Sequence, residues 1–376
     1  MTIICFSHLR WNFVYQRPQH LCTRFSKEYT IYFVEEPIFS EGDDHNITAP
    51  AGNNIHIVTP CLNRSNTSDT GSRQEILLNK MIVEENICRY VFWYYSPMMF
   101  LFSKQFQPAL VVYECMDELS TYKFAPPQLK EAEQELLKKA DVVFTGGYSL
   151  YHAKKNLHHN IYPFPSSIEK ERFSKARACN QEPVDQQHIS HPRLGFFGVL
   201  DERFDIDLIR EAAKQKPRWN FIFIGPVVKI HPDDLPRREN IFFLGAKSYD
   251  ELPAYINGWD IALIPFAINE STKFISPTKT PEYLAAGKPV ISTAIKDVVD
   301  PYGKQNLVSI IHSAQEFIDA GEKILQQKNK TKWLEEVDGF LAENSWENTF
   351  TKMNAIIKKA LNINNNYNRN KKEIYV

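Results

Sequence analysis

The chain has 376 residues, of which 43% are hydrophobic and 24% are charged, the balance of an ordinary globular protein. This length exceeds one compact core and predicts two domains of roughly 150–200 residues each. The 44 Lys and Arg residues nearly match the 45 Asp and Glu residues, which leaves a formal net charge of −1. A dedicated nucleic-acid-binding protein is therefore not expected, because such proteins present a basic surface.

The cysteines and the hydrophobic runs indicate the cellular compartment in which the protein is expected. The six cysteines have no CxxC spacing, which disfavours a disulfide framework and a structural zinc site. The opening stretch TIICFSH is typical of a strand and lacks the basic region and cleavage site of a signal peptide. No run of about 18 apolar residues occurs. We therefore expect a cytoplasmic protein with reduced thiols and no membrane-spanning helix.

In the predicted first domain, residues 1–173, short hydrophobic runs alternate with amphipathic stretches. This alternation is typical of βαβ units around a parallel sheet. The predicted strands are residues 2–7, 30–34, 54–59, 90–95, 110–114, 141–145 and 161–164. The predicted helices are residues 18–27, 74–85, 127–140 and 149–157.

Residues 174–192 are polar, lack a hydrophobic period and end in Pro, so we predict a linker there. The alternation resumes over a predicted second domain, residues 193–345. The predicted strands are residues 193–199, 220–224, 241–244, 260–265, 289–292 and 308–311. The predicted helices are residues 205–215, 249–258, 281–286, 314–327 and an interrupted helix over 331–361.

The predicted fold class is therefore α/β, with two Rossmann-like domains facing across a cleft. Ligands are expected in that cleft, at the carboxyl ends of strands from both domains. The Asn-rich tail, residues 362–376, is predicted to be disordered. Its few basic residues leave open a weak contact with a membrane or a partner.

The most informative stretch is Ser276-Pro-Thr-Lys-Thr-Pro-Glu-Tyr-Leu-Ala-Ala-Gly-Lys-Pro-Val290. Ser276 or Thr278 is placed to cap a short helix that begins near Pro281 and ends at Gly287. The free N–H groups of that helix, with Thr278 and Lys279 beside them, could hold a diphosphate. Glu282 could accept two hydrogen bonds from a ribose diol. The alternative is an ordinary capped helix whose Glu282 only complements the helix dipole.

The string SPTKTPEYLAAGKPVI resembles the ribose- and phosphate-binding motif of GT-B glycosyltransferases of the group-1 (GT4-like) class, in its SPxKxxEY variant. The similarity extends over nearly all of residues 193–350, and FSHLRWNFVYQRPQHL and VVYECMDEL resemble bacterial polysaccharide-assembly members of that class. The resemblance implies that the second domain holds most of a nucleotide-sugar donor. It also implies that a last helix, residues 346–361, crosses back to the first domain.

The resemblance assigns roles to several residues of the second domain. It puts Glu282 on the ribose, and Ser276, Thr278 and Lys279 on the phosphates. It puts the loop from Gly198 to Arg203 beside the diphosphate, and we assign the charge there to Arg203. The alternative for Arg203 is a salt bridge with Asp205 or Asp207.

One departure from the family pattern concerns the donor sugar. The commonest pattern has a second Glu eight residues before the ribose Glu, where this chain has Phe274, and Glu270 is out of register. The donor-sugar contacts and the stereochemical outcome therefore stay open, and retention is favoured because the class resembled is mostly retaining.

The nucleobase is expected along two strand ends of the second domain, Gly225–Val227 and Leu244–Ala246. Backbone groups of Gly225 and Leu244 could bind the base there, and Tyr249 could stack on it. The alternative for Tyr249 is packing along a helix edge.

Acceptor contacts are expected from the first domain. His8 and Arg10 follow the first strand, and Arg17 and His20 open the first helix, where Arg17 could bind an anion. Asp117 follows the strand at 110–114 and could act as a general base or position an acceptor hydroxyl. Glu114 is the weaker candidate, because a carboxylate within the strand would need a partner. The alternative for Asp117 is a helix or loop cap, and the alternative for His20 is the surface of the helix.

A metal or other cofactor is not expected. Asp205 and Asp207 form a DxD pattern, but they stand at a helix start, where Asp is favoured as a cap. Arg203, Lys279 and a helix dipole would then balance the diphosphate charge. The aromatic stretch 89–103 is expected to be a buried strand over 90–95, with residues 98–102 either buried or facing a lipid.

We therefore predict a cytoplasmic glycosyltransferase that takes part in the assembly of a surface polysaccharide or glycolipid. A peripheral position at the inner membrane face is compatible with this prediction. Its substrates would be a nucleoside-diphosphate-sugar, UDP-linked rather than GDP-linked, and a carbohydrate or lipid-linked acceptor. Two alternatives are a nucleotide-sugar epimerase of similar architecture and a non-catalytic sugar-nucleotide-binding regulatory protein.

Overall fold

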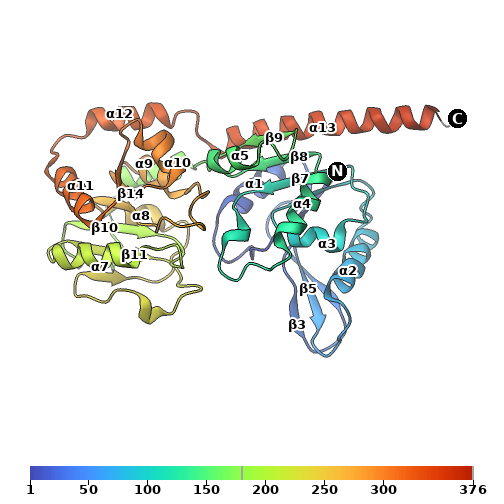
Figure 1. The fold of residues 1–376 in the computed structure, drawn as a ribbon, viewed down its shortest axis with the longest axis horizontal. Coiled ribbons are helices and arrows are strands. Elements are labelled where there is room, and N and C mark those ends of the chain that lie inside the picture. Colours follow the sequence, from blue (N-terminus) through green and yellow to red (C-terminus); the bar gives the residue numbers. More distant parts are fainter. Residues whose placement is uncertain (179–180, 375–376) are drawn as a thin grey trace.

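The computed structural model describes residues 1–178 and 181–374, with side chains as far as Asn364. Over these residues the chain forms two sheets, each flanked by helices, which lie side by side (Figure 1). The first half of the chain builds one unit and the second half builds the other. The predicted α/β class with two Rossmann-like domains is confirmed.

The first sheet has the strand order β3-β5-β2-β1-β6-β7-β8-β9, with β4 antiparallel on β5 and the pairs along that path parallel. Its strands are β1 Thr2–Phe6, β2 Thr30–Val34, β3 Ile38–Ser40, β4 His45–Pro50, β5 Ile55–Asn63, β6 Tyr90–Tyr94, β7 Leu110–Cys115, β8 Val142–Thr145 and β9 Ile161–Pro163. The helices of this half are α1 Arg17–Phe25, α2 Thr70–Glu84, η1 Pro97–Met99, α3 Phe100–Ser103, η2 Leu119–Thr121, α4 Leu129–Lys139, α5 Tyr148–Lys154, α6 Lys170–Ser174 and η3 Lys175–Arg177.

The second sheet has the order β12-β11-β10-β13-β14-β15, and its recorded pairs are parallel. Its strands are β10 Arg193–Phe197, β11 Asn220–Ile224, β12 Ile241–Phe243, β13 Ile261–Ile264, β14 Val290–Thr293 and β15 Val308–Ile311. The helices are α7 Ile206–Gln215, η4 Pro232–Asp234, α8 Leu252–Asn257, α9 Lys279–Ala285, α10 Lys296–Val298, η5 Val299–Gly303, α11 Ala314–Gln326, α12 Thr331–Phe340 and α13 Trp346–Ile374.

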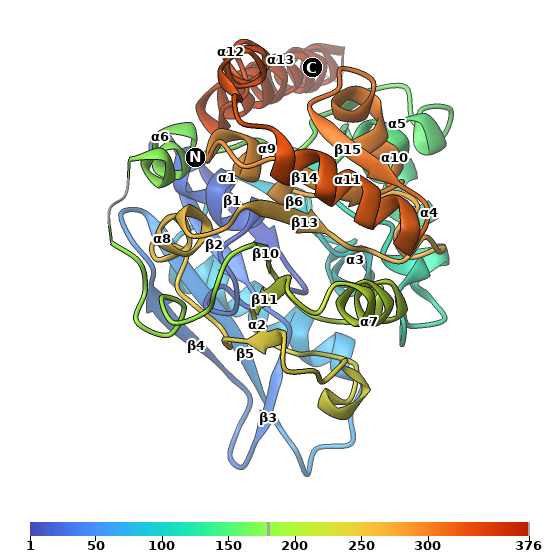
Figure 2. The same cartoon turned by 90° about the vertical axis from the view of Figure 1, so that its left-hand side faces the viewer.

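Two strands were not predicted from the sequence. β3 and β4 form, with β5, a projection that extends from the first sheet (Figures 1 and 2). Most residues of β3 and β4 are exposed, so neither strand has the buried face whose hydrophobic alternation reveals a strand. The segment predicted to be a linker contains η3, whose Arg177 donates to the Ala285 carbonyl at 2.7 Å.

The central strands of the first sheet, β1 and β6, are buried on both faces, as expected for parallel strands flanked by helices. Alternate residues of β1 and β6 enter two separate clusters, Ile3 and Trp93 on one face and Ile4 and Phe92 on the other. The aromatic stretch that begins at β6 is consequently internal. Phe100 and Phe102 join the second of these clusters, so they do not form a lipid-facing patch.

The last helix, α13, returns to the first domain and lies along it beside α1 (Figure 1). Trp346, Met353 and Ile357 are buried in the core of the first domain. The helix continues to Ile374, whereas the sequence predicts disorder from residue 362. Extending an existing helix adds a hydrogen bond for each residue fixed and avoids the cost of nucleation, so the polar sequence can continue it.

Replacing one buried side chain of α13 tests how much this return contributes. Ile357→Ala removes a fully buried side chain and should lower the free energy of unfolding by roughly 2–4 kcal/mol. Lys359→Ala, on the exposed side of the same helix, is the control and should change it by less than about 0.5 kcal/mol. Urea unfolding followed by tryptophan fluorescence measures both. Equal stability of the two variants would contradict the packing role.

Candidate active site

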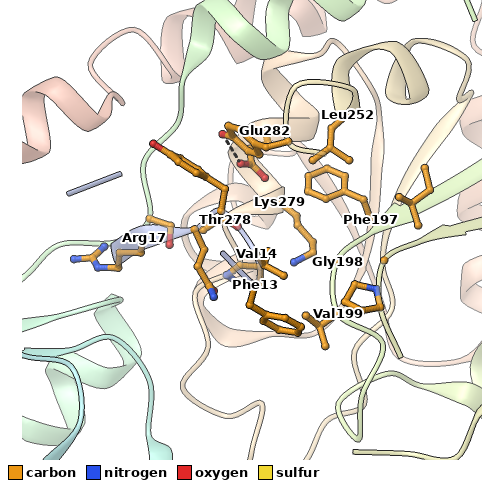
Figure 3. A pocket seen from close by; sticks show the side chains of 18 of the residues that line it. Phe13, Val14, Arg17, Phe197, Gly198, Val199, Leu252, Thr278, Lys279 and Glu282 are labelled. Atoms are coloured by element: carbon orange, nitrogen blue, oxygen red, sulfur yellow. Dashed lines mark hydrogen bonds between the residues drawn. The ribbon is translucent and has the colours of Figure 1, made fainter. Parts of the chain in front are cut away.

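A cavity of about 670 Å³ lies between the two domains, at the carboxyl ends of strands from both sheets. Its size is in the usual range for small-molecule sites. The first domain contributes the loop after β1 and residues after β7, and the second contributes the loops after β10, β11 and β12 and the start of α9. The predicted residues that line it are Arg17, Asp117, Gly198, Arg203, Gly225, Tyr249, Ser276, Thr278, Lys279 and Glu282 (Figure 3).

Glu282 lies in the first turn of α9, with only 4% of its surface exposed. Its Oε1 accepts a long hydrogen bond of 3.4 Å from Tyr249 Oη, which Figure 3 shows as a dashed line. Its Oε2 is buried and has no hydrogen-bond partner among the described residues. Burial raises the pKa of Glu282, and the nearby Lys279 charge opposes that rise. An oxygen in this state is available to accept hydrogen bonds from a ligand.

Lys279 stands at the start of α9, and its amine points toward Gly198 (Figure 3). The amine lies 5.5 to 5.9 Å from the ring centroids of Phe196, Phe197 and Phe266. Burial lowers the pKa of Lys279, although Glu282 favours its charged form. No ion pair of Lys279 is recorded within the described part of the chain. An amine that lines the cavity without a recorded ion pair is suited to bind an anion.

Two glycines make room for this amine. Gly198 has a φ of +139°, and a Cβ there would lie 2.3 Å from Lys279 Cε. Gly225 has a φ of +141°, and a Cβ there would lie 1.9 Å from the Gly198 carbonyl oxygen. The loops after β10 and β11 can therefore approach each other and Lys279 only because both residues lack side chains. Leu244, predicted beside them, packs against the core outside the cavity, and its neighbour Ala246 lines it.

Arg203 is held by Asp201, which lies in the same loop. The guanidinium forms a 2.7 Å ion pair from Nη2 to Asp201 Oδ2. The alternative partners considered from the sequence are occupied elsewhere, since Asp205 caps α7 through Leu208 N and Asp207 pairs with Arg210. Arg203 also lies 5.4 Å from the ring centroid of Tyr122, which belongs to the first domain.

Asp117 faces the same cavity from the first domain. Burial raises the pKa of Asp117, while Arg203 and a hydrogen bond with Tyr122 favour the carboxylate. The weaker candidate, Glu114, is fully buried in β7 and forms a 2.8 Å ion pair with Arg17 Nη2. Glu114 therefore anchors Arg17 in the cavity wall.

Three of the predicted acceptor-side residues lie outside the cavity. Arg10 turns away and pairs with Glu35 at 2.9 Å. His8 is enclosed near Lys229 of the second domain, and its Nδ1 has no partner among the described residues. His20 is 2% exposed and stacks on Trp346 with 4.6 Å between ring centroids. The sequence shows that these residues follow a strand or open a helix, but it does not show which side chain the last helix covers.

Tyr249 lines the cavity but differs from the prediction in what it stacks on. Its ring stacks on Tyr15 at 5.1 Å and has the Arg172 guanidinium 4.9 Å from its centroid. Tyr249 is therefore also a contact across the domain boundary, and its stacking on a nucleobase stays a prediction.

Several lining or supporting residues were not predicted. The loop Trp11–Gln16 forms the wall of the cavity on the first-domain side, and Tyr122 and Asp201 hold Arg203. The aromatic and polar string WNFVYQ directly after a strand was the available signal for the loop. No sequence signal indicated Tyr122, because its contact with Arg203 depends on how the two domains meet.

No group of three His, Cys, Asp or Glu side chains suited to a metal ion occurs in the chain as described, residues 1–178 and 181–374. Five cysteines are free thiols, four of them buried, and the sixth, Cys179, is outside the described residues. Within the same ranges, no helix has the length and hydropathy needed to span a membrane.

The comparisons with known proteins agree with this geometry. Residues 191–327, which build most of the second domain, match the family model of the "Glycosyl transferases group 1". This match identifies the second domain as a group 1 glycosyltransferase domain, and the two-domain fold of the chain is the GT-B fold of the similar solved structures.

Individual relatives fit the same class. The chain is 27% identical over 280 residues, 69% of each chain, to TuaH of Bacillus subtilis (strain 168), named as a teichuronic acid biosynthesis glycosyltransferase. Sucrose-phosphate synthase from Thermosynechococcus elongatus has a TM-score of 0.69 at 14% identity, with 95% of this chain and 98% of that chain covered. Anabaena HepE in complex with UDP has a TM-score of 0.67 at 13% identity, with 96% and 100% covered.

Phe274, which stands where the commonest family pattern has a second Glu, packs against the first-domain core cluster. It contributes an apolar contact between the domains and has no carboxylate to offer a donor sugar. Glu270 is exposed and pairs with Lys273 at 3.4 Å.

The enclosed His8 should make the stability of the protein depend on pH. Burial, with the Lys229 charge, lowers the pKa of His8 to about 4, whereas an unfolded chain titrates near 6.5. The unfolded state therefore gains a proton first, and stability is lost as the pH falls from about 6.5 toward 4. The wild type should lose unfolding free energy between pH 7 and pH 4.5. In His8→Gln that loss should be smaller by roughly 2 kcal/mol, because the titrating group is gone.

The control is His45→Gln, because His45 lies on the exposed strand β4. Urea unfolding at both pH values should give His45→Gln the wild-type difference. A His8→Gln protein that loses as much stability as the wild type would show that His8 titrates normally.

Proposed function

We propose that the protein transfers a sugar from a nucleoside-diphosphate-sugar, UDP-linked rather than GDP-linked, to a carbohydrate or lipid-linked acceptor. The observation that supports this most directly is the pair of groups at the start of α9, a half-buried lysine and a buried glutamate. Lys279 offers an amine without a recorded ion pair, and Glu282 offers a carboxylate oxygen without a recorded hydrogen bond. A diphosphate and a ribose diol are complementary to these two groups.

The comparisons support UDP as the nucleotide. Two similar structures are described as a complex of Anabaena HepE with UDP and an E. coli trehalose-6-phosphate protein bound with UDP-2-fluoro glucose. In our proposal the ribose lies against Glu282, the diphosphate lies between Lys279 and Arg203, and the base lies along the Gly225 and Ala246 strand ends.

In this arrangement the chemistry requires charge compensation at the leaving diphosphate. Lys279 and Arg203 would supply it in the cavity between the domains, where preorganised charges stabilise a developing negative charge. The reaction would then need no metal ion. Asp117, across the cavity, would position or deprotonate the acceptor hydroxyl. Retention of configuration is proposed from the class to which the protein belongs.

The acceptor is proposed to be part of a surface polysaccharide or glycolipid. The names of two similar proteins support this, TuaH for teichuronic acid biosynthesis and WaaG for lipopolysaccharide biosynthesis. A cytoplasmic site of action, peripheral to the inner membrane face, suits such acceptors. The epimerase and the non-catalytic alternatives are disfavoured, because the family and the named relative are transferases.

Removing the proposed ribose ligand should weaken nucleotide binding. Glu282→Ala should reduce UDP affinity by roughly 1–3 kcal/mol, the value of a hydrogen bond to a charged group. Glu270→Ala removes an exposed carboxylate from the same domain and should leave the affinity unchanged. Isothermal titration calorimetry with UDP and GDP measures both variants. Unchanged UDP and GDP affinity in Glu282→Ala would remove the ribose role.

Separate variants should distinguish acceptor activation from donor binding. Asp117→Asn should lower sugar transfer by a factor of about 10²–10⁴ while UDP affinity stays the same, because Asp117 is proposed to act only on the acceptor. Lys279→Ala combined with Arg203→Ala should lower transfer further and weaken UDP binding as well. A radiolabelled-donor transfer assay, alongside calorimetry, measures these effects. Full transfer activity of Asp117→Asn would exclude its acceptor role.

A further inference from the structure

The carboxylate of Glu282 is connected to the first domain by a short chain of polar contacts. Tyr249 Oη lies 3.4 Å from Glu282 Oε1 and also 3.4 Å from Nε2 of His20. Glu282 and Tyr249 belong to the second domain, whereas His20 lies in α1 of the first. No other hydrogen bond to the Glu282 carboxylate is recorded among the described residues.

His20 is itself fixed in place. Its ring is stacked on Trp346, the first residue of α13, with an angle of 12° between the planes, and Tyr15 packs edge-on at 4.7 Å. Burial, together with the Arg24 and Arg172 charges, lowers the pKa of His20 well below its usual value, so the ring is neutral. We assign its hydrogen to Nε2, because Tyr249 Oη can then accept from His20 and donate to Glu282.

The position of Tyr249 is likewise determined by both domains. Its ring stacks on Tyr15 of the first domain at 24° between planes, and its edge meets Phe173 at 5.7 Å. The position of the Tyr249 hydroxyl, and so its hydrogen bond to Glu282, therefore depends on the first domain.

We infer that Tyr249 and His20 are positioning residues that hold the Glu282 carboxylate in its ribose-binding orientation, so that first-domain residues set nucleotide affinity. This inference rests on the proposed function, because it assumes that Glu282 binds the ribose. The geometry explains why two residues predicted for other contacts lie side by side. In this proposal His20 and Tyr249 act on the ribose through Glu282.

The test measures recognition of the ribose diol alone. The ratio of the dissociation constants of 2′,3′-dideoxy-UDP and UDP reports the contact between the diol and Glu282, and calorimetry gives both constants. Two variants remove the polar atoms and keep the rings, Tyr249→Phe and His20→Phe. Tyr29→Phe is the matched control, because it removes a buried tyrosine hydroxyl that donates to Asn354 at 2.8 Å, outside the cavity.

We expect the wild type and Tyr29→Phe to prefer UDP at least tenfold. Tyr249→Phe and His20→Phe should each reduce that preference at least threefold, and the double variant should lose no more than Tyr249→Phe alone, since both act through one carboxylate. A packing defect would instead weaken both ligands equally and leave the ratio unchanged, and that outcome overturns the inference. A wild type without any preference overturns the ribose role of Glu282 and the inference with it.

Discussion

The desolvation of the Lys279 amine, which Glu282 offsets only in part and which no recorded ion pair relieves among the described residues, is the constraint on which the site depends. Burying an ammonium group is costly unless it is compensated, and aromatic rings compensate it only in part. The surrounding backbone is adapted to the Lys279 side chain. A Cβ at Gly198 would collide with that side chain, and a Cβ at Gly225 would collide with the Gly198 backbone. The strand ends of the second sheet are therefore shaped around one amine, and the complementary ligand is an anion.

The two domains meet through two different kinds of contact. Away from the cavity, Asp297 accepts a hydrogen bond from the Ser149 amide at 2.9 Å. Two further contacts lie at the cavity itself. Ser166 donates to the Ser276 carbonyl at 3.1 Å, and the Arg203 guanidinium lies against the ring of Tyr122, so these contacts involve residues that a substrate would also meet.

Much of the fold and part of the site follow from the sequence. The strands with two buried faces were predicted nearly to the residue, as β2 and β15 show, because their hydrophobic runs end at Gly, Pro or polar residues. The helix that carries Lys279 and Glu282 was found from a string of fifteen residues whose local spacing determines the turn. β3 and β4 were missed because their side chains are solvated on both faces.

Positions that depend on the meeting of distant segments could not be predicted in this way. His20 follows the same pattern whether α13 covers it or not, and the stacking of Tyr249 on Tyr15 requires the second domain to be in place. Arg203 has acidic residues on both sides in the chain, and only the folded loop selects Asp201.

The return of α13 to the first domain also affects how the protein is made. Tyr29 donates a hydrogen bond to Asn354, a residue 325 positions later, so this part of the core lacks its partner until α13 has been synthesised. Until then the hydrophobic surface around Phe25 and Trp93 is not covered by α13. Exposed hydrophobic surface of this kind favours aggregation and chaperone binding during folding. The core cluster of the second domain ends at Leu341 and contains no residue of α13, so its packing does not depend on that helix.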